Sequence, residues 1–150
     1  MKLTCAASSK AGEVFSRQSV LLAACGSTKG ASHEIFRRAP ANGWILVTIP
    51  YAIAETVRNL SDFPAAASAN WAGLRPGLLI MDDVLTFELP VVFPAGKDRP
   101  ILFSALAWSD ILLTLDRGDF GGLMDKPFYG LVVLKPGLFL ERERTAGRLL

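Results

Sequence analysis

Short apolar runs bounded by turn-forming residues decide the fold class of this chain. Residues 44–49 read Trp-Ile-Leu-Val-Thr-Ile, and residues 111–115 read Ile-Leu-Leu-Thr-Leu. Continuous runs of this kind are typical of strands that are buried on both faces of a parallel sheet. They are far shorter than the roughly 20 apolar residues that a membrane-spanning helix needs. The runs therefore predict buried strands in a protein without a membrane segment.

Predicted helices alternate with the apolar runs along most of the chain. Pro50 and Pro100 each stand where the first turn of a helix tolerates proline. Ile53, Val57 and Leu60 recur at helical spacing after Pro50, so we expect them to face the core. The expected helices cover residues 19–25, 32–38 (with Ser32 as N-cap and Asn42-Gly43 ending the element), 50–60, 65–71 and 100–108. The expected strands cover residues 14–15, 44–49, 78–81, 84–93, 111–115, 131–134 and 138–140.

This alternation predicts an α/β fold with three layers, in which helices cover both faces of a mostly parallel sheet. A length of 150 residues suits one domain. We expect a loose N-terminal segment over residues 1–12, the domain over 13–140, and a charged tail, helical or frayed, over 141–150. Ligand sites in such folds lie at the carboxyl ends of the strands.

The residue inventory excludes several kinds of chemistry. Two cysteines, Cys5 and Cys25, and the single His33 are too few for a disulfide framework or a typical zinc site. Serine and cysteine nucleophiles lack a suitable base, and neither a nucleophile elbow nor a nucleotide-binding glycine motif occurs. The N-terminus lacks the apolar stretch of a signal peptide. We therefore expect a cytoplasmic protein.

Charge is distributed unevenly along the chain. The net charge is +2, but residues 1–75 hold eight basic and four acidic side chains, whereas residues 76–150 hold eight basic and ten acidic ones. This asymmetry suits a phosphate-attracting surface beside a carboxylate-rich pocket, and it suits a mixed solvated surface equally well.

Three carboxylates stand at positions where a site is expected. Asp116 follows the run 111–115, Asp98 precedes the helix that Pro100 opens, and Glu55 lies in the helix after Pro50. Together they would suit Mg²⁺ or Mn²⁺, because hard cations prefer oxygen ligands. Each also has a structural interpretation: Asp98 as a helix cap, Glu55 as a solvated helix residue, and Asp116 as a turn former.

The order of these motifs resembles the PIN-domain family, in particular the branch that holds toxin components of toxin–antitoxin pairs. The resemblance is carried by Val20-Leu-Leu-Ala-Ala-Cys-Gly-Ser-Thr-Lys-Gly-Ala-Ser-His-Glu-Ile-Phe, by Ile49-Pro-Tyr-Ala-Ile-Ala-Glu-Thr-Val, and by the segment from Asp98-Arg-Pro-Ile to Thr114-Leu-Asp-Arg-Gly-Asp-Phe. It covers residues 14–120, about two thirds of the chain.

The resemblance implies a four- or five-stranded parallel sheet and a ribonuclease that uses Mg²⁺ or Mn²⁺ to hydrolyse RNA phosphodiesters. It implies Glu55, Asp98 and Asp116 as the catalytic, metal-binding residues. The resemblance also implies supporting roles for Ser19, Thr114 and Asp119. The implied partners are RNA, a cognate antitoxin protein and a second copy of the chain, with no membrane.

One position departs from the family pattern. The first strand of the family normally ends in an Asp-x-Asn type motif, and the corresponding residues here are Arg17-Gln18-Ser19. A guanidinium beside carboxylates pairs with them and competes with a dication. We therefore hypothesise that Arg17 displaces the metal and bridges some of Glu55, Asp98 and Asp116.

Two functional classes follow from this departure. One is a ribonuclease with an impaired centre, and the other is a non-catalytic PIN-like module that binds nucleic acid or protein. A third reading is that the stretch before Ser19 is altered sequence, because the residues after it match the family better.

Overall fold

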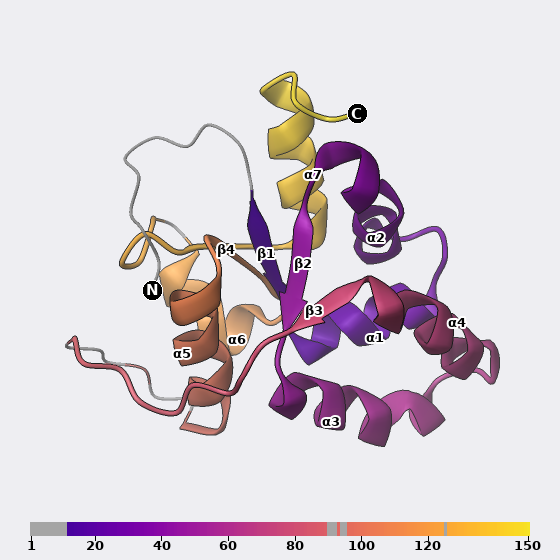
Figure 1. Ribbon diagram of the computed structural model, residues 1–150, viewed down its shortest axis with the longest axis horizontal. Helices are drawn as coiled ribbons and strands as arrows, with labels where there is room; N and C mark the ends of the chain where they lie inside the picture. The colour runs from indigo at the N-terminus through magenta and orange to yellow at the C-terminus, as the bar shows by residue number, and fades with distance from the viewer. Residues whose placement is uncertain (1–11, 90–92, 94–95, 125) are drawn as a thin grey trace.

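A computed structural model describes residues 12–150 except 90–92, 94–95 and 125, and it contains a five-stranded parallel sheet (Figure 1). The strands are β1 (Glu13–Ser16), β2 (Ile45–Thr48), β3 (Leu78–Ile80), β4 (Ile111–Leu113) and β5 (Val132–Leu134), in the order β3-β2-β1-β4-β5. All four strand pairs are parallel. The predicted α/β class and the predicted sheet are confirmed, while the loose segment expected at the N-terminus lies outside the described residues, apart from residue 12.

Side chains alternate between the two faces of the sheet and pack into two core clusters. Val14, Leu46 and Leu113 belong to the first cluster, and their neighbours Phe15, Val47 and Leu112 belong to the second. This period of two is the geometry of strands buried on both faces. The three layers predicted from the sequence are therefore present.

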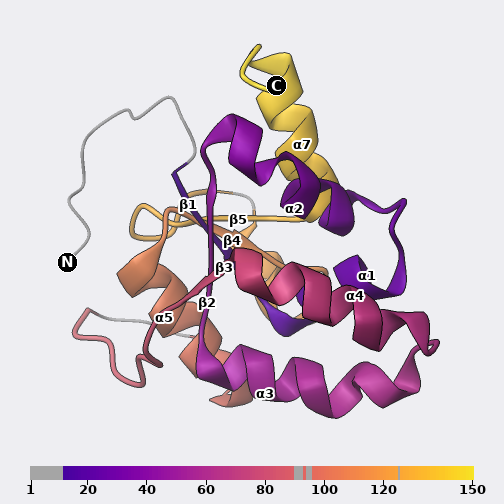
Figure 2. The same cartoon turned by 45° about the vertical axis from the view of Figure 1, so that its right-hand side comes forward.

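Different helices supply the two outer layers (Figure 2). The first cluster receives residues from α1 (Gln18–Gly26), α2 (Ala31–Asn42), α4 (Ala66–Leu74) and α7 (Pro136–Thr145). The second receives residues from α5 (Arg99–Trp108), from the short α6 (Arg117–Phe120) and from the first turn of α3 (Pro50–Asn59). None of the helices in the described part of the chain is long and apolar enough to cross a bilayer.

The strand predicted at 84–93 does not form in the described part of that stretch. Residues 84–89 have no regular structure and lie along α5, where the Val84 N–H donates to the Ser104 hydroxyl at 2.8 Å. The Phe87 ring stacks on Phe103 at 5.7 Å. Contacts with helix side chains thus replace the backbone pairing that a strand would need, and residues 90–92 lie outside the described residues.

The strand predicted at 138–140 is also wrong, because these residues belong to α7. Pro136 occupies the first turn of this helix, a position where proline is tolerated. The buried residues are Pro136, Phe139, Leu140 and Glu143, which recur at i, i+3, i+4 and i+7. Two residues of the apolar triplet, Phe139 and Leu140, therefore belong to a helical stripe whose last member is charged, while Leu138 is exposed.

Two helix details differ from the predictions as well. Gly30 is the N-cap of α2 in place of Ser32, which lies inside the helix. The helix passes Arg38, and it ends at Asn42-Gly43 as predicted. In α3 the buried side chains are Ala52 and Thr56, whereas Val57 is 53% exposed. The predicted stripe is therefore wrong at Val57 but confirmed at Leu60, which is buried in the first core cluster, and at Ile53, which packs against that cluster.

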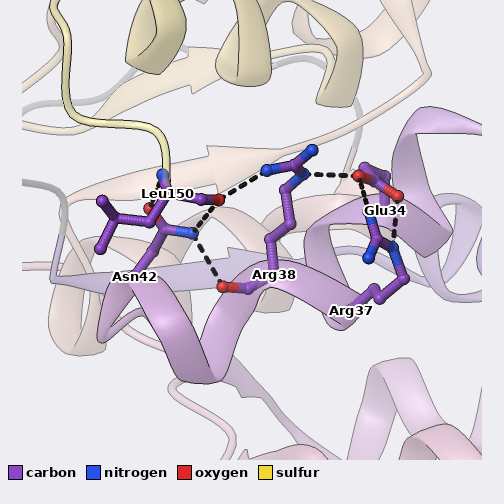
Figure 3. Close-up of polar contacts among 5 residues, drawn as sticks. All are labelled: Glu34, Arg37, Arg38, Asn42 and Leu150. Atoms are coloured by element: carbon purple, nitrogen blue, oxygen red, sulfur yellow. Dashed lines mark hydrogen bonds and ion pairs between the residues drawn. The ribbon is translucent and has the colours of Figure 1, made fainter.

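The C-terminal residues pack against α2 (Figure 3). The Leu150 N–H donates to Asn42 Oδ1 at 2.8 Å, and Arg38 and Asn42 Nδ2 donate to the Leu150 carbonyl. Within the same segment, Arg148 donates twice to the buried Glu143 carboxylate, at 2.8 and 3.2 Å. Residues 146–150 are therefore held to the domain by hydrogen bonds.

Candidate functional site

The candidate site lies where the strand order reverses. The chain passes from β1 through β2 to β3 on one side, and then places β4 and β5 on the other side of β1. Parallel α/β sheets bind ligands at such a switch point, outside the carboxyl ends of the two strands. Here those ends are Ser16 and Leu113, which are paired in register. Arg17 follows the first of them, and its N–H donates to the Leu113 carbonyl at 3.2 Å.

The Arg17 side chain points into the protein, where it binds two carboxylates. Its Nη2 donates to Asp98 Oδ1 at 2.7 Å, and its Nη1 donates to Asp116 Oδ2 at 3.0 Å. The side chain is only 5% exposed. The guanidinium carbon also lies 4.9 Å from the centre of the Phe120 ring, within the range of a cation–π contact. The hypothesised pairing of Arg17 with the acids is confirmed for Asp98 and Asp116.

Asp98 has the backbone position of a helix cap but a different side-chain role. It is the N-cap residue of α5, yet its side chain makes no capping hydrogen bond. The carboxylate is 3% exposed and accepts the hydrogen bond from Arg17. A carboxylate buried to this degree needs a partner, because its desolvation is costly. The capping interpretation of Asp98 is therefore correct for the backbone and wrong for the carboxylate.

Asp116 lies in the loop after β4, and two predicted supporting residues hold this loop. Thr114 Oγ1 accepts a hydrogen bond from the Asp116 N–H at 3.0 Å, and Ser19 Oγ accepts one from the Leu115 N–H at 3.3 Å. The Asp116 side chain is 34% exposed, so its carboxylate borders solvent. The side chain of the third supporting residue, Asp119, lies outside what the structure describes.

Glu55 is not part of the Arg17 ion pairs. It lies in α3 and accepts a hydrogen bond from Arg58, three residues further along the helix, at 2.7 Å. The third predicted acid thus has its own cation. Glu55 does affect the electrostatics nearby: burial, together with the negative charges of Glu55 and Asp98, raises the pKa of Tyr51 above its usual value, and Arg17 opposes this effect.

Sequence reasoning missed Tyr51 and Phe120. The Tyr51 hydroxyl donates to the Lys97 carbonyl at 2.7 Å, directly before Asp98, and so ties α3 to the turn that precedes α5. Its spacing of four residues from Glu55 is the signal that could have found it, since such residues share one face of a helix. Phe120 could be placed only after the fold had brought α6 beside Arg17.

The residues in this arrangement do not fit a divalent cation. Mg²⁺ and Mn²⁺ need several oxygen ligands at once, whereas Asp98 and Asp116 share the Arg17 guanidinium and Glu55 pairs with Arg58. Over the described residues, no group of three or more His, Cys, Asp or Glu side chains is placed to hold a metal ion. The two carboxylates share one guanidinium, so their negative charge is only partly compensated at the mouth of the switch point.

Comparison with known proteins adds no assignment. No family model matches the chain, and no curated protein matches it significantly. The resemblance to PIN domains therefore rests on the motifs quoted above.

Proposed function

We propose that this chain is a PIN-like domain in which Arg17 replaces the metal of an Mg²⁺- or Mn²⁺-dependent ribonuclease, so that RNA cleavage is impaired and the domain serves as a binding module. The observation that carries this proposal is the buried Arg17 guanidinium, which donates to both Asp98 and Asp116. The support from the fold is general: the sheet is parallel, and these residues meet at its switch point.

The chemical reason lies in the difference between the two kinds of cation. A metal ion in a hydrolase polarises a phosphoryl oxygen and makes a bound water more acidic. A guanidinium offers N–H donors in a fixed plane and coordinates no water as a Lewis acid. A site filled by Arg17 keeps the acidic side chains but lacks the group that would activate the nucleophile.

Single-stranded RNA is the proposed ligand, because it is the substrate class that the motifs imply. A cognate antitoxin protein and a second copy of the chain are the other proposed partners, on the same basis. Asp116 borders solvent at the strand ends, and the basic residues of the first half of the chain would offset its charge toward a phosphate backbone.

A cleavage assay with single-stranded RNA and Mn²⁺ tests the proposal. We expect no cleavage by the natural protein and measurable cleavage by Arg17→Asp, which restores the acidic residue of the family motif. The double variant Arg17→Asp/Asp116→Asn should be inactive again. Arg75→Asp is the matched control, because it makes the same change of charge at an exposed residue.

Binding is measured in parallel on the same RNA. RNA binding without cleavage by the natural protein supports the binding module. Cleavage by the natural protein that Asp116→Asn abolishes would show instead that the ribonuclease is intact. If the natural protein neither binds nor cleaves RNA, the proposed ligand is wrong.

A further inference from the structure

We propose that Asp98, Asp116 and Phe120 form a guanidinium-binding site that the chain fills with its own Arg17, and that this internal ligand holds the switch-point loops together. The inference goes beyond the proposed function, because it concerns what stabilises the site and is independent of whether the domain binds RNA.

Three segments that are distant in sequence meet at the Arg17 side chain. Arg17 directly follows β1, Asp98 precedes α5 at a distance of 81 residues, and Asp116 follows β4 at a distance of 99 residues. The hydrogen bonds of the guanidinium to Asp98 and Asp116 thus connect the end of the central strand to the start of a helix and to the loop after a neighbouring strand. A cation at this point therefore links residues that are separated by long stretches of chain.

The shape of the site matches a planar cation. The two terminal nitrogens of Arg17 donate to two different carboxylates, which uses the forked geometry of a guanidinium. The Phe120 ring lies 4.9 Å from the guanidinium carbon, and aromatic faces attract cations electrostatically. A metal ion would gain nothing comparable from an apolar ring, because it needs oxygen ligands. The chemical class of the ligand is therefore a guanidinium.

Burial gives the site its affinity. The Asp98 carboxylate is 3% exposed and the Arg17 side chain is 5% exposed, so the ion pair between them is shielded from water. Removal of one partner from a buried pair leaves an uncompensated charge, which is strongly destabilising. Truncation of Arg17 should therefore leave a cavity bordered by carboxylates that takes up a free guanidinium.

Thermal unfolding of Arg17→Ala with millimolar methylguanidinium tests the site without RNA. We expect the melting temperature of Arg17→Ala to lie about 10 °C below that of the natural protein. Methylguanidinium should raise the melting temperature of the variant by several degrees, because a ligand that binds only the folded state stabilises it. The natural protein should show no increase, since Arg17 already fills the site.

Two controls separate this effect from general cation effects. Tetramethylammonium at the same concentration should not raise the melting temperature of Arg17→Ala. The triple variant Arg17→Ala/Asp98→Asn/Asp116→Asn should not respond to methylguanidinium, because it lacks the carboxylates. Arg17→Ala is also measured with Mn²⁺. A melting temperature that rises with Mn²⁺ but not with methylguanidinium would overturn the proposal in favour of a metal site.

The remaining outcomes are also decisive. Equal melting temperatures for Arg17→Ala and the natural protein would show that Arg17 does not hold the loops together, and no response to methylguanidinium would show that the site does not select this cation.

If Arg17→Ala fails to fold, Arg17→Ala/Asp98→Asn replaces it. Recovery of folding in that double variant supports uncompensated charge as the cause, and failure to recover overturns the proposal. A failed cleavage assay leaves these results unaffected, because melting reports only on the protein.

Discussion

Asp98 and Asp116 accept hydrogen bonds from the same guanidinium but differ in their exposure to water. The Asp98 side chain is 3% exposed and that of Asp116 is 34% exposed. Loss of the Asp98 charge leaves Arg17 buried with less compensation, whereas solvent screens the loss at Asp116. We predict that Asp98→Asn lowers the free energy of unfolding by about 2–4 kcal/mol and Asp116→Asn by about 1 kcal/mol or less. Urea unfolding measures both, with the exposed Asp62→Asn as a control, and equal losses would contradict the prediction.

The pairing of Arg17 with acids was predictable from residue chemistry, because a cation that stands where the PIN-domain pattern has an aspartate needs negative charges to compensate it. The choice of partners was not. Glu55 drops out because Arg58 lies three residues away on the same helix, a local competitor that the motif comparison did not consider. Asp98 has the backbone position of a cap, and only the fold shows that its carboxylate turns to Arg17 instead.

At the scale of elements, α2 is joined to the C-terminal segment by Asn42 and Arg38, which both bind Leu150. Asn42 accepts the Leu150 N–H and donates to the Arg38 carbonyl within its own helix (Figure 3). We predict that Asn42→Ala lowers the free energy of unfolding by about 1 kcal/mol, because the Leu150 N–H and the Arg38 carbonyl lose their hydrogen bonds to the amide. Asn59→Ala is the matched control, since Asn59 donates only to the Glu55 carbonyl in its own helix. Urea unfolding and hydrogen exchange at Leu150 measure the effect, and an equal loss in both variants would contradict the role given to Asn42.

The strands that the sequence predicted well each contain a short run of apolar residues. Strands β2, β3, β4 and β5 each contain three consecutive apolar residues and β1 contains two, so short runs identify them even where Ile45 and Leu79 are exposed. Residues 138–140 form a similar apolar run but lie in a helix. The helical spacing of its buried residues is not evident from the sequence, because the next buried residue is the charged Glu143, which pairs with Arg148. The strand prediction for residues 84–89 is wrong for a different reason. These residues pack against α5 through side chains, and a local sequence pattern does not indicate such a contact.

At the scale of the whole molecule, the strand order creates the site. The apolar runs resemble one another, so the sequence pattern alone does not say that β4 lies beside β1 and not beside β3. That adjacency brings Leu113 opposite Ser16, and with it Asp116 to Arg17. The general expectation that a site lies at the strand ends follows from the fold class. Which side chains meet at those ends, such as Arg17 and Asp116, follows only from the order of the strands in the sheet.

The packing of the whole domain can be followed through Cys25, which lies in α1 within the first core cluster and is 1% exposed. Burial raises the pKa of its thiol from 9.0 to about 11. An unfolded chain loses this proton near pH 9, whereas the folded chain keeps it to a higher pH, so ionisation favours unfolding within that interval. We predict that the free energy of unfolding decreases from pH 9 to pH 11 more steeply in the natural protein than in Cys25→Ala. The difference between the two urea-unfolding profiles isolates this thiol from the tyrosines and lysines that titrate in the same range.

In a Cys5→Ser background, a thiol reagent should modify Cys25 only as fast as the core opens, so the modification rate should rise with urea in step with global unfolding. Parallel pH profiles, or fast modification of the native protein, would show that the core around α1 opens to solvent independently of the sheet.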